Sequence, residues 1–271
     1  MAEWASPGNV AYSAVGNKYV SPQYPACNAG DRLLLVVAYK PSSSGRVNAP
    51  AGWSPVAQRT DAGGYGGAYG SDIGNTSLHC YERDVPDGGL VGGQTVSFSD
   101  SGVAWAIILR VTSSHLPFAA TAATTGEDVA AGDVDIVFDG DPGVVAGDLC
   151  IVAMSIPTDE TTPNQFSGEA IAQPGVQFGD VAESAEPDTA NGDDIGGVIC
   201  YATAASGASA GAPQFTAVAS GPTTNVRGPA LFIRLRDASA PTPTPGGGRK
   251  PWGRDPWGRP AWGRAAWGRA G

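Results

Sequence analysis

A pattern of strand-forming residues occurs twice in this chain, and it restricts the possible folds more than any other feature of the sequence. Three segments of the first half recur in the same order in the second half, at offsets of 117, 120 and 124 residues. The pairs are Ala29–Ala38 with Ala146–Ser155, Leu78–Tyr81 with Val198–Tyr201, and Ala106–Val111 with Ala230–Leu235. A slowly growing offset is what insertions in loops produce. The pattern therefore predicts duplication of a unit of about 110–120 residues, the size of one β-sandwich domain.

The residue types within each repeat favour strands over helices. The pairs Gly30-Asp31 and Gly147-Asp148 predict turns, and each precedes a continuous apolar run that is typical of a strand buried on both faces. The chain also carries 39 glycines and 22 prolines, which is too many for a helical protein. We predict an all-β fold with two tandem duplicated β-sandwich units, jelly-roll-like or immunoglobulin-like, followed by an extended tail.

Composition shifts place the boundaries of these parts. We expect the first unit over residues 1–115, the second over 116–237, a linker over 238–248 and a basic arm over 249–271. The linker is first proline-rich and then glycine-rich, so we expect it to be extended and then flexible.

The arm contains four copies of the tripeptide Trp-Gly-Arg, each called a word, at a five-residue period. Its net charge is +5, whereas residues 1–248 sum to −15. Large aromatic side chains in a segment without a core of its own favour burial by a partner, and the opposite charges favour an interaction arm. The predicted partner-binding residues are Trp252, Arg254, Trp257, Arg259, Trp262, Arg264, Trp267 and Arg269.

The period of the words limits how the arm binds. Five helical steps of about 100° leave successive rings far apart around an α-helix, and an odd period alternates sides along a strand. We therefore expect discrete pockets, each receiving one tryptophan with its arginine nearby. The alternative for the arm is low-complexity disorder.

Acidic loops offer weak candidates for a calcium site. The denser loop cluster, which begins near Glu186, provides the candidate ligands Asp188, Asn191, Asp193 and Asp194. A second group comprises Asp133, Asp135, Asp139 and Asp141. Oxygen-rich loops suit Ca²⁺, but neither group has EF-hand spacing, and solvated acidic turns are the alternative. No other cofactor is expected.

The cysteines are predicted to be structural. Alternation places Leu78 with Cys80, and Val198 with Cys200, on inward sides of their strands. Cys80 and Cys200 stand at equivalent positions in the repeat, and Cys150 lies in an apolar strand, so we expect three small buried hydrophobic residues. A disulfide through Cys27 is disfavoured for a protein made in the cytoplasm.

Catalytic patterns are weak. The chain has two histidines, His79 and His115, and neither lies near a Gly-x-Ser-x-Gly elbow. Paired carboxylates remain open as a catalytic possibility, because glycan-cleaving enzymes need only two. We predict that the protein is not an enzyme.

The first unit resembles a β-sandwich unit of tailed-bacteriophage minor tail and fibre proteins. The resemblance depends on the Gly30-Asp31 turn with its buried strand, the word Ala49–Trp53, the alternating strand around Cys80-Tyr81 and the closing strand Ala104–Val111. The second unit has Gln173–Val176 in place of that word. The resemblance implies a structural or adhesive role and names no catalytic residue.

These features predict a structural component of a tailed-phage virion, a minor tail or tail-tip protein. Its arm would dock on other virion proteins or on copies of itself, with the sandwiches facing outward. The alternative is a glycan-binding adhesin that attaches to the host surface. A nucleic-acid-binding arm is disfavoured by the acidic body, which would repel the same polyanion. No signal peptide is visible and the longest apolar runs are strand-sized, so we expect synthesis in the host cytoplasm, no membrane insertion and a final location in the virion.

Overall fold

The structure is a computed structural model that describes residues 1–13, 16–41, 45–62, 76–113, 117–128, 133–157, 166–187, 195–219 and 228–238. Contacts divide the chain into a body, Met1–Pro241, and a segment Thr242–Gly271 that lies outside the described residues. All regular elements in the described ranges are strands, which confirms the all-β prediction. They are β1 (Ala2–Pro7), β2 (Ala11–Tyr12), β3 (Asn17–Val20), β4 (Arg32–Pro41), β5 (Ser54–Ala62), β6 (Thr76–Asp84), β7 (Val96–Ser113), β8 (Ala122–Asp128), β9 (Val134–Val137), β10 (Leu149–Ile156), β11 (Phe166–Ala172), β12 (Val176–Phe178), β13 (Ala182–Ala185), β14 (Gly196–Gly207), β15 (Gln214–Ala219) and β16 (Gly228–Leu235).

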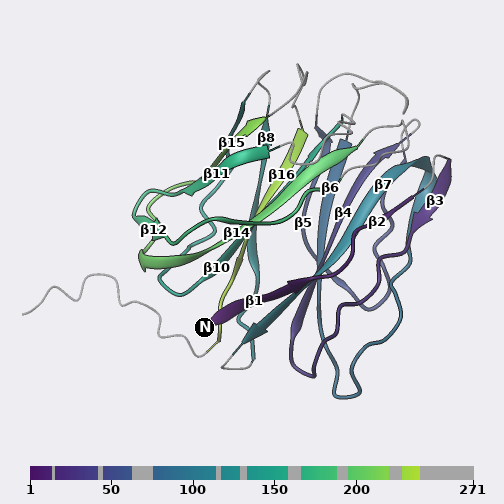
Figure 1. Cartoon of the computed structure of the whole chain (residues 1–271), viewed down its shortest axis with the longest axis horizontal. Helices are drawn as coiled ribbons and strands as arrows, with labels where there is room; N and C mark the ends of the chain where they lie inside the picture. The colour runs from purple at the N-terminus through teal and green to yellow at the C-terminus, as the bar shows by residue number, and fades with distance from the viewer. Residues whose placement is uncertain are drawn as a thin grey trace, which may run out of the picture. The chain divides into compact units, whose positions relative to one another are not determined.

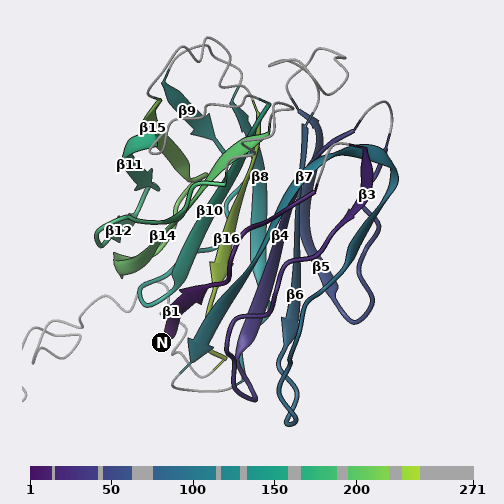
Figure 2. The ribbon, with the colours of Figure 1, turned by 45° about the vertical axis from the view of Figure 1, so that its right-hand side comes forward.

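The strands form three antiparallel sheets. Sheet 1 has the order β1-β7-β4-β6-β5, with β2 and β3 also paired to β7. Sheet 2 has the order β12-β14-β10-β16-β8, with β13 also paired to β14, and sheet 3 has the order β11-β15-β9. Figures 1 and 2 show sheet 3 on the side of sheet 2 that faces away from sheet 1. In the part of the chain that the structure describes, no helix is long and apolar enough to cross a bilayer.

Sheets 1 and 2 share a strand order and a register. The central strand β4 lies between β7 and β6, and β10 lies between β16 and β14. Leu33 pairs with Arg110 in sheet 1, and Cys150 pairs with Arg234 in sheet 2. These pairs are the ones that the sequence offsets of 117 and 124 residues relate to each other. The first and third pairs of recurring segments therefore occupy matching places in the two sheets.

The two Gly-Asp turns also match. Gly30 and Gly147 both have φ near +87° (+85° and +89°), a conformation that glycine adopts without strain. The Asp31 carboxylate accepts the Asn28 N–H at 2.7 Å, and that of Asp148 accepts the Val145 N–H at 2.8 Å. Each aspartate therefore closes its own turn, as the sequence predicted, and starts the central strand of its sheet.

The predicted equivalence of Cys80 and Cys200 is wrong. Val36 pairs with Cys80, whereas its counterpart Ala153 pairs with Ile199, so Ile199 is the residue that matches Cys80. A shift of one residue turns a side chain to the opposite face of a sheet. Cys80 consequently faces sheet 2, while Cys200 faces sheet 3. The predicted sharing of faces, Leu78 with Cys80 and Val198 with Cys200, is confirmed.

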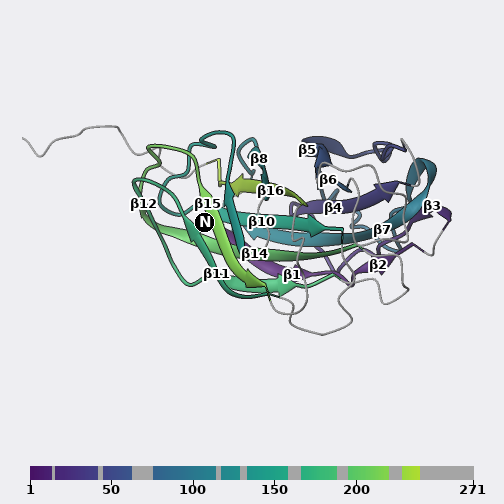
Figure 3. The same ribbon diagram turned by 90° about the horizontal axis from the view of Figure 1, so that it is seen from above.

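A central core joins sheets 1 and 2 face to face. It takes alternate residues of β4, such as Leu34 and Val36, and their counterparts on β10, Ile151 and Ala153. Figure 3 shows the two sheets with β5 against β8 and β6 against β16, so that the equivalent strands β7 and β16 lie toward opposite edges of the pair of sheets. This is the arrangement of a pair related by an approximate two-fold axis, with the same face of each sheet in the contact.

Two outer cores cover the remaining faces. Sheet 2 packs against sheet 3 through residues that include Phe138, Phe215 and Phe232. The outer face of sheet 1 is covered by loop residues around Trp53 and by β3. Because β4 and β10 are buried on both faces, neither half closes as a sandwich independent of the other: the halves share the central core.

Candidate functional site

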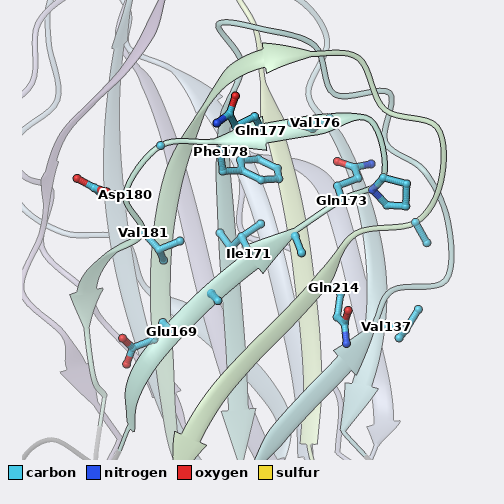
Figure 4. Close-up of a pocket in the computed structure, with 15 residues that line it drawn as sticks. Val137, Glu169, Ile171, Gln173, Val176, Gln177, Phe178, Asp180, Val181 and Gln214 are labelled. Atoms are coloured by element: carbon cyan, nitrogen blue, oxygen red, sulfur yellow. The ribbon is translucent and has the colours of Figure 1, made fainter.

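An open groove of about 800 Å³ lies between sheets 2 and 3 (Figure 4). Its walls are β12, an edge strand of sheet 2, and β11, an edge strand of sheet 3. The chain passes from one sheet to the other through a single turn, so the two strands diverge beyond it. The groove is the space left between them.

The turn that forms this groove requires a glycine. The Val176 N–H donates to the Gln173 carbonyl at 3.1 Å, and Gly175 between them has φ +83°. A Cβ on Gly175 would lie 2.3 Å from the Ala208 carbonyl oxygen. That carbonyl belongs to the segment whose N–H donates back to Gly175 O at 3.1 Å. The turn is therefore held against the end of β14, and its position is fixed.

The lining of the groove combines apolar, amide and acidic side chains. Ile171, Val176 and Phe178 supply apolar surface, and Glu169 and Asp180 supply carboxylates. Figure 4 shows the Phe178 ring between the β11 and β12 backbones, with Gln173 near it at the turn. The amides also include Gln177 and Gln214.

Gln173 is held in one orientation and leaves an acceptor unused. Its Nε2 donates to Asp141 Oδ1 at 3.0 Å and to the Gly211 carbonyl at 2.8 Å. Both partners are acceptors, which assigns the amide nitrogen to that side. The side chain is 5 % exposed, and its Oε1 is buried without a hydrogen-bond partner. A buried acceptor without a donor is uncommon in folded proteins, and burial keeps this oxygen out of reach of a ligand in the open groove.

Three glutamates gather beside one end of the groove. The carboxylate oxygens of Glu169, Glu183 and Glu186 all lie within 4.8 Å of one another. Burial, followed by repulsion from Glu186 and Glu169, raises the pKa of Glu183 to about 7. Glu186 Oε1 accepts the Phe166 N–H at 2.9 Å, which ties the cluster to β11. A cation placed here would relieve the repulsion between these carboxylates.

Most sequence-predicted site residues lie outside the described ranges. They are the calcium candidates Asp188, Asn191, Asp193 and Asp194 and the arm residues Trp252, Arg254, Trp257, Arg259, Trp262, Arg264, Trp267 and Arg269.

The second aspartate group of the sequence does not assemble into one site. Asp135 accepts from Gln214, Asp139 pairs with Arg59 at 3.2 Å, and Asp141 accepts from Gln173. Within the described ranges, the one cluster of acidic, histidine and cysteine side chains close enough to hold a metal consists of the three glutamates. Of the three glutamates, the sequence indicates Glu186 alone. Glu169 and Glu183 lie on strands of different sheets, and the proximity of these strands leaves no local signal in the sequence.

Three cysteines and the described histidine are buried, namely Cys80, Cys150, Cys200 and His79, whereas Cys27 is half-buried. All four thiols are free, and burial raises the pKa of the thiols of Cys80, Cys150 and Cys200. Burial likewise lowers the pKa of His79 to about 4, and neither of its ring nitrogens has a hydrogen-bond partner. A neutral imidazole without an orienting partner lacks the arrangement of a catalytic triad. His115 lies outside the described residues.

No family model, curated protein or solved structure matches this chain. A functional assignment therefore has to come from the groove, the charge distribution and the sequence of the arm.

Proposed function

We propose that this protein is a non-enzymatic structural component of a tailed-phage virion, a minor tail or tail-tip protein. Its C-terminal arm docks on neighbouring subunits, and its β-sandwich body faces outward. The observation that carries the proposal is the division of the chain into a compact body and a separate C-terminal segment of opposite charge. A multivalent aromatic and basic segment attached to an acidic body suits docking between protein subunits.

We also infer that the body arose by duplication of one unit. Three observations support the inference: the shared strand order, the matching Leu33–Arg110 and Cys150–Arg234 registers, and the matching Asp31 and Asp148 turns. The central core then corresponds to the interface of an ancestral two-fold dimer. A body built in this way is rigid, because its central strands are buried on both faces.

The alternative function is binding of a host-surface glycan. The groove favours it, because Phe178 offers an apolar ring and Gln177, Gln214 and Asp180 offer hydrogen-bonding groups. Concave sites of this composition bind small polar ligands. This alternative assigns recognition to the body rather than to the arm.

Deletion of residues 249–271 separates the two functions. If the arm docks on subunits, the deleted chain should fold but fail to enter particles that are otherwise complete. A matched control replaces Arg254, Arg259, Arg264 and Arg269 by lysine, which keeps the charge and the tryptophans. Normal incorporation of the deleted chain, with reduced attachment of particles to host cells, would contradict the docking function and support the glycan alternative.

A further inference from the structure

The groove between β11 and β12 has the features of a receptor for an aromatic and basic segment. We propose that it receives one Trp-Gly-Arg word from the arm of a neighbouring copy of this chain. The proposal rests on the proposed function, in which the arm docks on subunits, and it names the receiving surface.

Trp53 in the first half of the body is a tryptophan that the second half lacks at the matching position. In sheet 1, Trp53 directly precedes β5, whose Ser54, Pro55 and Ala57 pair with Glu82, Tyr81 and Cys80. In sheet 2, Val181 directly precedes β13, whose Ala182, Glu183 and Ala185 pair with Tyr201, Cys200 and Ile199. Because Ile199 matches Cys80, Val181 occupies the position of Trp53, and it lines the groove.

A tryptophan in the first half has become a valine in the second, and the groove lies beside that valine. The Trp53 indole is 7 % exposed and belongs to the outer core of sheet 1. Protein interiors are close-packed, so a valine cannot occupy the volume of an indole. The groove therefore includes the place where the matching half carries its own indole.

The hydrogen bonding of Trp53 supports the same occupant. Its Nε1 donates to Gln94 Oε1 at 2.9 Å, and Tyr24 stacks on it at 6.5 Å. In the groove, Phe178 offers an aromatic ring, and Gln177 and Gln214 offer amide oxygens. An indole N–H is a donor only, so an inserted tryptophan can donate to one of these glutamine oxygens as Trp53 donates to Gln94.

The charges of the groove fit the arginine of each word. In an extended segment, residues i and i+2 point to the same side about 7 Å apart. A word whose tryptophan enters beside Phe178 therefore directs its arginine along the same groove. Glu169 and Asp180 line that groove, and Glu183 and Glu186 lie beside Glu169. The acidic body and the basic arm are complementary over the same contact.

The donor is a different copy because the proposed function places the arm on neighbouring subunits. In an extended arm, successive words face opposite sides, so adjacent words meet different surfaces. The matching position in sheet 1 is already filled by Trp53. Of the two matching positions, the one in the groove is therefore open. Four words on one arm then link several bodies, and the full chain should self-associate.

Sedimentation of the full-length chain over a range of concentrations tests the proposal. Val181→Trp fills the groove from within, as Trp53 does in sheet 1, and should weaken self-association at least about tenfold, the loss expected for a buried aromatic anchor. Val91→Trp is the matched control, because Val91 is 93 % exposed and outside the groove. It should associate as the unaltered chain does.

A second groove variant guards against misfolding of the first. Asp180→Lys changes an exposed residue, so the fold should persist, and charge reversal should also weaken association. A chain with all four arm tryptophans changed to alanine keeps its groove but has no donor. Mixed with the Val181→Trp chain, which keeps its arm, it should form complexes that neither variant forms alone.

Three results would overturn the proposal: a monomeric unaltered chain at about 100 μM, undiminished association of both groove variants, or no complex in the mixture. At this concentration, an association with a dissociation constant of about 1 μM would be almost complete. Failure of the groove is distinguishable from failure of the proposed function. If arm deletion blocks entry into particles while the groove variants enter normally, the arm docks elsewhere and the function stands.

Discussion

Replacement of Trp105 by alanine should destabilise both halves of the body together. Trp105 lies on β7 in sheet 1, is fully buried in the central core, and its Nε1 donates to the Gly196 carbonyl in sheet 2 at 3.1 Å. Loss of a buried tryptophan costs about 3–5 kcal/mol, and the abandoned carbonyl adds about 1 kcal/mol. The total of about 4–6 kcal/mol approaches the whole stability of an ordinary domain.

Urea unfolding followed by far-ultraviolet circular dichroism measures this effect. We expect one transition in the unaltered body and one transition at a much lower urea concentration in Trp105→Ala. Trp105→Phe keeps most of the apolar contact and should fall between them. Two separated transitions, with one unchanged by the substitution, would show that the halves fold independently and that the shared core does not couple them.

Three further substitutions test particular contacts. Burial lowers the pKa of His79 to about 4 from 6.5, so the unfolded chain binds more protons than the folded chain at pH values between these two. The free energy of unfolding should therefore fall by about 3 kcal/mol as the pH drops through that window. In urea titrations at a series of pH values, His79→Gln should reduce this pH dependence. Asp148→Ala removes the acceptor for Val145 and Arg236 and should cost about 3–5 kcal/mol by thermal melting, whereas the exposed control Asp87→Ala should change little. Gly228→Ala would place a Cβ 1.8 Å from the Ser155 carbonyl oxygen and should lower the free energy of unfolding by at least about 1–3 kcal/mol. Gly88 has open space around it, so Gly88→Ala should change that free energy by no more than about 0.5 kcal/mol. Equal effects of the two substitutions would refute the packing argument.

The sequence predicted strands well and contacts between strands poorly. Gly30-Asp31 and Gly147-Asp148 marked the starts of β4 and β10, because a turn followed by an unbroken apolar run has few other solutions. The one-residue offset between Cys80 and Cys200 was missed because the shared Cys-Tyr pair aligned the two segments by residue type, whereas pairing with β4 and β10 sets their register. The lack of alternation in β4, which is buried on both faces, hid the shared central core, since either face of β4 could have met either half.

The glutamate cluster was hidden for a different reason. Glu169 and Glu183 belong to strands in different sheets, and their proximity depends on how β11 and β13 pair with β15 and β14. Isolated glutamates on short polar strands look like solvated residues in a sequence. The unpaired oxygen of Gln173 is equally invisible, because it follows from the orientation that Asp141 and Gly211 impose on the amide.

The difference between the two halves limits how copies of this chain can assemble. A two-fold symmetric body would carry two equivalent receptor sites, but Trp53 fills one of them and the groove beside Val181 remains open. A contact between an arm and this groove joins unlike surfaces, so it is heterologous and propagates from copy to copy. Such contacts close into rings when the rotation between copies permits and otherwise continue as filaments. With valine at one of the two matching positions and tryptophan at the other, the pair of sheets offers one open receptor site, and the proposed contact therefore gives the subunit a direction.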